Sequence, residues 1–194
     1  MTITNVMRLL KQANIPFETS EYEVDESDLS GVHAAQMLGI DPDCMFKTLV
    51  AKGEKKGVHV FCIPVAEELD LKKCAQAAGE KKIELIHVKE LLGLTGYVRG
   101  GCSPIGMKKK YPTTLDETAI LFDKIYVSAG QRGVQVILNP EQLAAYVGAD
   151  FADLTKRCSE VETNEGSALR FQWNALRRYA VSPRGLAQLH EAEV

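Results

Sequence analysis

The loop spanning residues 100–110, GGCSPIGMKKK, has the composition of a ligand-binding segment. Its paired glycines, Gly100 and Gly101, let the backbone approach another molecule closely, because no Cβ stands in the way. A Ser-Pro turn at Ser103 follows, and three lysines at residues 108–110 add positive charge. This pattern predicts a backbone-lined pocket beside an anionic ligand. A tight loop with a solvated basic tail has the same composition, and the sequence alone does not separate the two.

Lys47 is the second candidate, because it lies within an expected strand. Side chains alternate between the two faces of a strand, so Lys47 shares its face with the apolar Met45, Leu49 and Ala51. A lysine in such surroundings is costly unless it lies at a mouth or binds an anion. Partial burial would lower its pKa, and a neighbouring phosphate or carboxylate would raise it. It could hold a ribose phosphate or polarise an ester carbonyl, or it could extend to water from a strand end.

The backbone of Gly100 and Gly101 offers two further geometries, which stay open at this point. Free N–H groups there would stabilise an oxyanion, whereas a carbonyl there would hold the amine or thiol of a substrate. Arg132, in the turn at residues 130–133, would add charge for a phosphate, or is a solvated turn residue. No Gly-x-Ser-x-Gly elbow, His-Glu-x-x-His motif or P-loop is present, and no nucleophile–base pair is evident.

Composition limits the class of protein. The chain has 194 residues, 45% of them apolar, and a net charge of −3, which excludes a broadly basic nucleic-acid coat protein. Residues 1–43 carry a net −6 and the remainder +3, so one face could meet phosphate, although ordinary scatter would give the same count. Five cysteines without a CxxC pair support neither zinc nor disulfides and fit a reducing cytosol. No apolar run approaches the length of a membrane span, and we read the N-terminal residues as structure rather than a targeting segment.

Strands and helices are expected to alternate along the chain, with several short hairpins, which favours a mixed sheet over a parallel one. Helices are expected at residues 4–13, 31–38, 70–79, 88–92 and from 140 onward, where Ser30, Asp70 and Asn139 read as caps. Strands are expected at residues 17–25, 45–52, 58–65, 83–86, 96–99, 113–116, 125–128 and 134–138.

Three segments in collinear order, residues 46–50 (FKTLV), 100–110 and 126–133 (YVSAGQRG), together resemble the YbaK family of aminoacyl-tRNA deacylases. The resemblance covers about residues 3–156. It implies an α+β fold, with a mixed, barrel-like β-sheet flanked by helices, in a domain of residues 1–156. Residues 157–194 would form a C-terminal extension of unknown role. The basic and aromatic cluster around Trp173 in that extension could contact nucleic acid or pack on the domain.

The resemblance also implies roles for particular residues. Lys47 would be the essential residue, working with Gly100 and Gly101. The residues expected to bind substrate are Tyr22, Ser103, Ser128 and Arg132. Cys102 stands where the family commonly has an aliphatic residue, so we do not expect it to be a nucleophile. No metal or cofactor is expected.

Family deacylases cleave cysteine from mischarged proline tRNA, and the thiol of the substrate is thought to attack its own ester. The implied partners are the acceptor end of tRNA and prolyl-tRNA synthetase, with no membrane, in the cytoplasm. Arg99, Ala129 and Gln135 depart from the family pattern, so the amino-acid preference stays open. Two alternatives remain: a deacylase for alanine or serine that uses water, and a non-catalytic module that binds tRNA or a synthetase.

Overall fold

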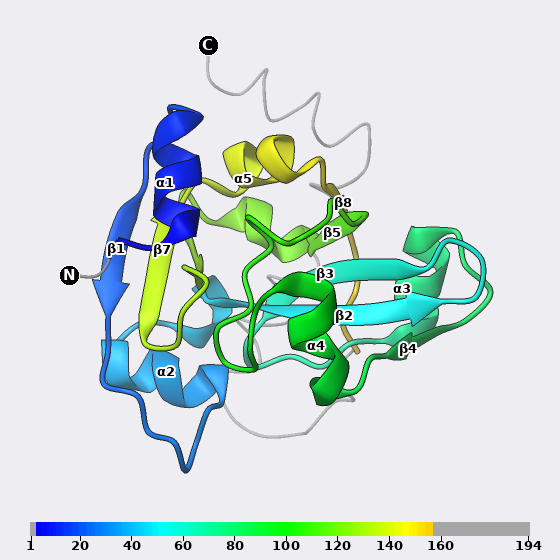
Figure 1. Ribbon diagram of the computed structural model, residues 1–194, viewed down its shortest axis with the longest axis horizontal. Coiled ribbons are helices and arrows are strands. Elements are labelled where there is room, and N and C mark those ends of the chain that lie inside the picture. Colours follow the sequence, from blue (N-terminus) through cyan, green and yellow to red (C-terminus); the bar gives the residue numbers. More distant parts are fainter. Residues whose placement is uncertain (1–2, 157–194) are drawn as a thin grey trace, which may run out of the picture. The chain divides into compact units, whose positions relative to one another are not determined.

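The computed structural model describes residues 3–156, which lie within one compact unit, Met1–Lys156. The expected basic and aromatic cluster around Trp173 lies outside the described residues. Figure 1 shows the arrangement of the helices and strands in this unit.

The described part of the chain contains five α-helices, and short polar residues or glycines lie at most of their ends. They are α1 (Asn5–Gln12), α2 (Gly31–Leu38), α3 (Leu71–Ala78), α4 (Val88–Thr95) and α5 (Pro140–Val147). The side chains of Thr4, Ser30, Asp70 and Asn139 accept the first free N–H groups of α1, α2, α3 and α5. Helices α2 to α5 each end at a glycine in the left-handed conformation, which glycine adopts at little cost.

The larger sheet has the strand order β4-β2-β3-β5-β8. Its strands are β2 (Phe46–Gly53), β3 (Val58–Pro64), β4 (Ile83–Leu85), β5 (Thr113–Asp116) and β8 (Asp150–Ala152). β2 pairs antiparallel with β3 and with β4, whereas β5 runs parallel to both β3 and β8. The long β2–β3 pairing fixes Lys47 opposite Ile63, one residue from the start of β2.

The smaller sheet is antiparallel and has the order β1-β7-β6, with β1 (Glu18–Glu21), β6 (Ile125–Ser128) and β7 (Val134–Leu138). A single parallel bridge between Met45 and Tyr126 connects it to the larger sheet. The main core combines side chains from both sheets and from α1, among them Phe46, Val127 and Leu10. Two short 3-10 helices, η1 (Pro42–Cys44) and η2 (Glu117–Leu121), complete the fold.

The expected mixed α+β fold is confirmed, but its barrel-like detail is not, because the described strands form two open sheets joined by one bridge. The expected strand at residues 96–99 is wrong. Gly96 has φ +85° and caps an α4 that continues to Thr95, beyond the expected end at residue 92. Strand β8 was not predicted, since its three residues carry no alternating pattern. No helix in residues 3–156 is both long and apolar enough to cross a membrane.

Candidate functional site

Lys47 lies on β2, on the face that also carries Leu49 and Ala51. Its side chain is half-buried, and its Nζ donates a hydrogen bond to the Val65 carbonyl at 3.0 Å. Loss of hydration lowers the pKa of Lys47, and the carboxylates of Glu68 and Glu67 oppose this shift only in part. The expected effect of partial burial on this lysine is therefore present, and the structure holds the ammonium at a fixed point.

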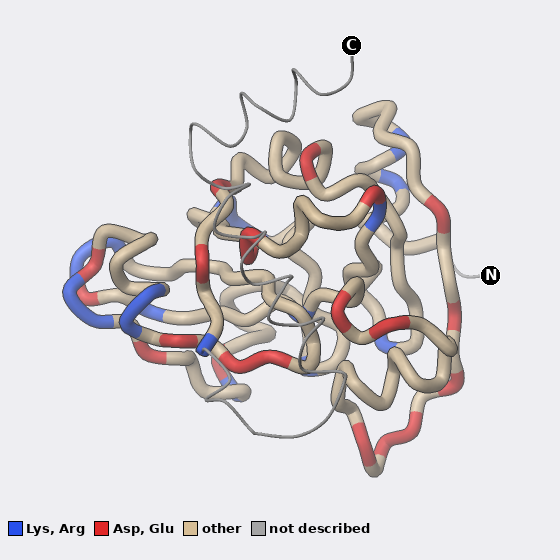
Figure 2. The backbone as a smooth tube through the Cα atoms, turned by 180° about the vertical axis from the view of Figure 1, so that it is seen from behind, with Lys and Arg blue, Asp and Glu red and all other residues tan. Residues whose placement is uncertain are grey.

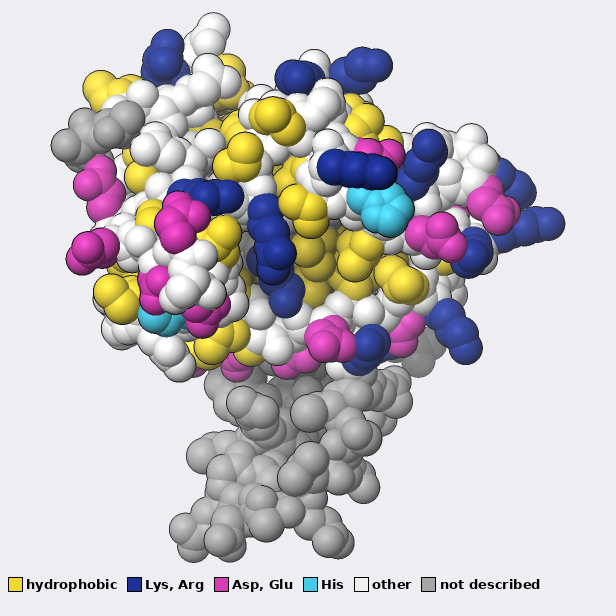
Figure 3. All heavy atoms as spheres, turned by 60° about the horizontal axis from the view of Figure 1, so that its bottom comes forward, with side chains coloured by type: hydrophobic (Ala, Val, Ile, Leu, Met, Phe, Trp, Pro, Cys, Tyr) yellow, Lys and Arg dark blue, Asp and Glu magenta, His cyan; other side chains and the backbone are white. Residues whose placement is uncertain are grey.

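A groove of about 670 Å³ opens beside Lys47. The groove residues are Lys47, Leu49, Glu68, Leu69, Asp70, Leu71, Lys72, Leu85 and Lys156. Four leucines form its apolar part, and a 2.7 Å ion pair between Lys156 and Glu68 lies among its charged residues. Clefts of this size and composition hold small organic ligands with a few fixed polar contacts. Figure 3 shows a face of the molecule on which Lys and Arg side chains lie in a hollow beside exposed hydrophobic side chains.

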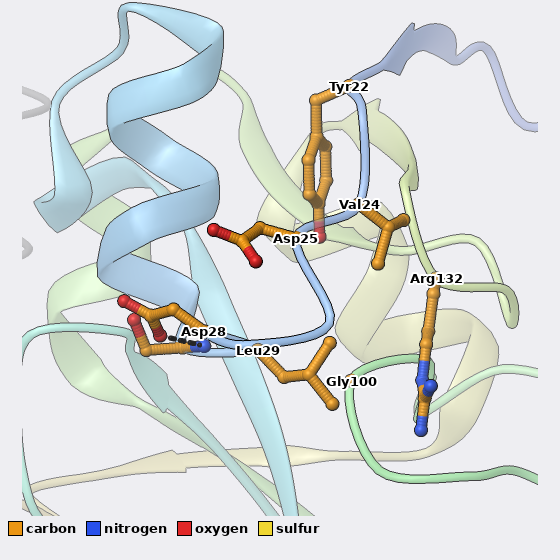
Figure 4. Close-up of a pocket in the computed structure, with 8 residues that line it drawn as sticks. Tyr22, Val24, Asp25, Asp28, Leu29, Gly100 and Arg132 are labelled. Carbon is orange, nitrogen blue, oxygen red and sulfur yellow. Dashed lines mark hydrogen bonds between the residues drawn. The ribbon is translucent and has the colours of Figure 1, made fainter.

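A second, smaller pocket lies between the segment that follows β1 and two glycine-containing loops (Figure 4). Its lining residues are Tyr22, Val24, Asp25, Asp28, Leu29, Ser30, Gly100 and Arg132. The structure thus brings together three of the expected site residues, Tyr22, Gly100 and Arg132. Its volume is about 10 Å³, which is room for about one water molecule.

Lys47 does not line this small pocket, but a short series of contacts connects Lys47 to the residues that do. Val65, whose carbonyl accepts the Lys47 hydrogen bond, packs in the same apolar cluster as Tyr22. A Cβ on Gly31 would lie 2.3 Å from the Val65 side chain, so the start of α2 rests directly on Val65. Ser30, the residue before it, lines the small pocket. The ammonium of Lys47 and the Tyr22 pocket are therefore held by one packed unit.

The Gly100–Gly101 loop has a geometry different from the expected one. The Gly101 N–H is not free, because it donates to the Val98 carbonyl at 3.0 Å and closes a turn in which Gly100 has φ +84°. A Cβ on Gly101 would lie 3.1 Å from the Arg132 backbone nitrogen, so its close approach is to a turn of the same protein. Gly100 is exposed, and its N–H donates to no group in residues 3–156. Of the two expected free N–H groups, only that of Gly100 remains.

The two expected serines are buried and already hydrogen-bonded. Ser103 is fully buried, and its Oγ accepts the Ile105 N–H at 3.3 Å. Ser128 ends β6, and its Oγ accepts the Gly130 N–H at 3.2 Å. Neither residue lines the groove or the small pocket, so both hold the loops that carry Gly100 and Arg132.

Two contributors were not predicted from the sequence. The Tyr97 hydroxyl donates to the Ile105 carbonyl at 2.5 Å, and its ring packs against Gly130, which ties the Gly100 loop to the β6–β7 turn. Glu26 forms an ion pair with Arg132. The role of Tyr97 was missed because residues 96–99 were expected to form a strand. The Glu26–Arg132 ion pair joins residues 106 positions apart, and no local sequence pattern predicts such a pair.

Comparisons with known proteins identify relatives of this chain. The family model described as "Aminoacyl-tRNA editing domain" matches residues 29–146. A protein of Enterococcus faecalis named "Putative Cys-tRNA(Pro)/Cys-tRNA(Cys) deacylase EbsC" is 47% identical over 154 residues, 79% of this chain and 94% of that protein. The "Uncharacterized protein YwhH" of Bacillus subtilis is 25% identical over 146 residues, 75% of this chain and 91% of that protein.

A solved structure has the same fold. It is described as "Crystal structure of a putative trans-editing enzyme for prolyl tRNA synthetase", and it matches with a TM-score of 0.66 and 25% identity. The match covers 80% of this chain and 99% of that one. The resemblance read from the three sequence motifs is confirmed, and the chain belongs to the aminoacyl-tRNA editing domain family.

Proposed function

We propose that this protein is an aminoacyl-tRNA deacylase that removes cysteine from mischarged Cys-tRNA(Pro). The observation that carries the proposal is Lys47, a half-buried ammonium beside an apolar groove in a chain of the editing-domain family. The E. faecalis relative, 47% identical, is named for activity on Cys-tRNA(Pro) and Cys-tRNA(Cys), which supports this choice of substrate.

Lys47 would act as a fixed hydrogen-bond donor and positive charge. An ammonium carries three protons, and Val65 accepts one of them, so two remain for an ester carbonyl or the terminal ribose. Because half of the side chain is already out of water, its charge acts on a bound ester more strongly than an exposed lysine would. Gly100 is exposed and lines the small pocket, so its N–H, unpaired within residues 3–156, offers a further donor there.

The nucleophile would be the substrate's own thiol. As a thiolate, its sulfur would attack the ester carbonyl carbon, form a thiolactone, and release the ribose oxygen, which takes up a proton. The protein's own thiol and hydroxyl groups support a nucleophile that comes from the substrate. Burial raises the pKa of the Cys102 thiol to about 12. The Ser103 and Ser128 hydroxyls accept N–H groups of their own loops. The protein would supply position and charge, which can contribute several kcal/mol.

Editing of this kind compensates for the limited ability of a synthetase to distinguish similar amino acids. Proline and cysteine are similar in size, and a synthetase pocket separates small side chains poorly, so a second site that destroys the wrong ester restores accuracy. We propose prolyl-tRNA synthetase as the partner that brings the proline tRNA, since a net charge of −3 provides little attraction for RNA. The place of action would be the cytoplasm, with residues 1–156 as the editing domain and 157–194 as an extension.

The test compares the release of radiolabelled amino acid from Cys-, Ala- and Ser-tRNA(Pro), with and without prolyl-tRNA synthetase. We expect fast loss from Cys-tRNA(Pro) and little from the other two, because neither alanine nor the weakly nucleophilic serine can replace the thiol. Equal loss of alanine and cysteine would contradict the thiol mechanism and favour attack by water. Binding of tRNA without any loss would contradict deacylation and favour a binding module.

A further inference from the structure

Arg132 is arranged as an anion-binding residue. Its Nε donates to the Arg99 carbonyl at 2.9 Å, which fixes the side chain alongside the Gly100 loop (Figure 4). A Cβ at Gly100 would lie 3.5 Å from Arg132 Nε, so the absence of a side chain there keeps the space beside the guanidinium free. The Gly100 N–H, which has no acceptor in the described part of the chain, lies at the same loop.

In this structure a carboxylate of the protein itself, that of Glu26, binds the Arg132 guanidinium. Arg132 Nη1 contacts both carboxylate oxygens of Glu26, at 3.1 and 2.9 Å. The guanidinium suits carboxylates and phosphates alike, because its planar N–H groups match their oxygen pairs. Glu26 is 72% exposed, so its contact with Arg132 is a surface ion pair of small free energy.

The tip that carries Glu26 is an acidic turn that holds itself together. Asp25 accepts the N–H and hydroxyl of Ser27 at 2.8 and 2.6 Å, and Asp28 accepts the Ser30 N–H at 2.9 Å. In residues 3–156, the Glu26–Arg132 pair is the one polar contact from residues 25–28 to the loops of Gly100 and Arg132. Figure 2 shows the acidic residues gathered along this segment.

We propose that the Glu26–Arg132 ion pair is a latch that closes the Tyr22 pocket in the free protein, and that a phosphodiester of the tRNA acceptor end replaces Glu26 on Arg132. The pocket behind the latch has room for about one water molecule, so a ligand can enter only when residues 23–30 move away. The segment is anchored at both ends, where the Tyr22 N–H donates to the Gly133 carbonyl at 2.9 Å and Ser30 caps α2. With both ends held, the tip would move while β1 and α2 stay in place, at the cost of the 3.8 Å contact between Asp25 and His33 of α2. The inference rests on the proposed function in taking tRNA as the ligand.

The test measures the affinity of uncharged tRNA(Pro) at low ionic strength for the full-length protein and for single and double variants. Glu26→Gln removes the competing carboxylate, and we expect it to tighten binding by about two- to fivefold. Glu23→Gln is the matched control, because Glu23 is an exposed acid of the same segment with no ion pair in the described residues. It should change the affinity clearly less.

Arg132→Gln should weaken binding and lower the salt dependence of log Kd by about one unit, as expected for a lost phosphate contact. In the Arg132→Gln background, Glu26→Gln should have no further effect. The proposal is overturned if Glu26→Gln and Glu23→Gln act equally, or if the effect of Glu26→Gln persists without Arg132. Uncharged tRNA carries no ester, so this result is independent of deacylation: either proposal can fail while the other stands.

Discussion

At the scale of single residues, burial decides which groups are available for chemistry. Cys102 lies in the Gly100 loop, close in sequence to three lysines that could lower the pKa of a thiol, but the structure places its side chain in the core. Burial raises its pKa to about 12, so almost none of it is ionised at neutral pH. Lys47 differs, because its burial is partial and its ammonium keeps access to the groove.

Cys102→Ala should therefore leave the rate of cysteine release from Cys-tRNA(Pro) within about threefold of wild type, since a neutral thiol does no work in the reaction. Stability should fall by about 1 kcal/mol, because a small cavity replaces the sulfur. The measurements are single-turnover deacylation and urea unfolding. A loss of rate above about tenfold in a variant that unfolds normally would show that the thiol takes part.

At the scale of elements, a glycine loop is positioned by packing against a turn rather than by its own conformation. Gly101 lies 3.1–3.2 Å, measured from its would-be Cβ, from backbone atoms of Gln131 and Arg132. Tyr97 closes the other side through its hydrogen bond to the Ile105 carbonyl. The Gly100 loop and the β6–β7 turn therefore form one unit, and a change in either should reach the site.

Gly101→Ala should lower both stability and deacylation, because backbone atoms of the turn would have to shift by a few tenths of an ångström to admit a methyl group. Because the atoms that must shift belong to the backbone of a turn and not to a flexible side chain, we expect a loss of about 1 kcal/mol or more in the free energy of unfolding. Gly93→Ala is the matched control. Gly93 lies inside α4 with nothing within 4 Å of its would-be Cβ, so alanine there should stabilise by up to about 1 kcal/mol. Equal effects of the two substitutions would contradict the close packing of Gly101.

Local signals in the sequence predict the elements well and the contacts between them poorly. Ser30, Asp70 and Asn139 cap helices as expected, because a cap depends on residues within one turn. The closing of the Gly100 turn and the pairing of Arg132 with Glu26 depend on segments far apart in the chain, which no local pattern records. The same distinction explains the missed β8, which forms only because β5 offers a free edge.

At the scale of the whole molecule, charge is separated between the acidic segment after β1 and the lysines of the β2–β3 hairpin, which Figure 2 shows at opposite sides. The hairpin is held by a buried acid, Glu80, which accepts the N–H groups of Lys55 and Lys56 at 3.0 and 2.6 Å and contacts His59 at 3.3 Å. Burial alone would raise the pKa of Glu80, but these hydrogen bonds outweigh it and hold the pKa below its ordinary value.

Because the pKa of Glu80 is lower in the folded state than in the unfolded chain, its contribution to stability is complete above the unfolded pKa. That contribution is lost as the pH falls through the folded pKa. Glu80→Gln should therefore lower Tm at pH 7, and the difference from wild type should shrink as the pH falls below the ordinary glutamate pKa of 4.5. Glu54→Gln, at an exposed acid of the same hairpin, should follow the wild-type curve. A Tm difference for Glu80→Gln that is constant with pH would contradict this account.

The most direct test of the central claim is the first-order rate of cysteine release from Cys-tRNA(Pro) by wild type, Lys47→Ala and Lys52→Ala. Lys52 is the matched control, an exposed lysine on the same strand and on the opposite face. We predict a loss of about 100-fold or more for Lys47→Ala, as when a transition-state donor is removed, and a rate near wild type for Lys52→Ala. Equal rates for all three proteins would contradict the assignment of the reaction to Lys47 and its groove.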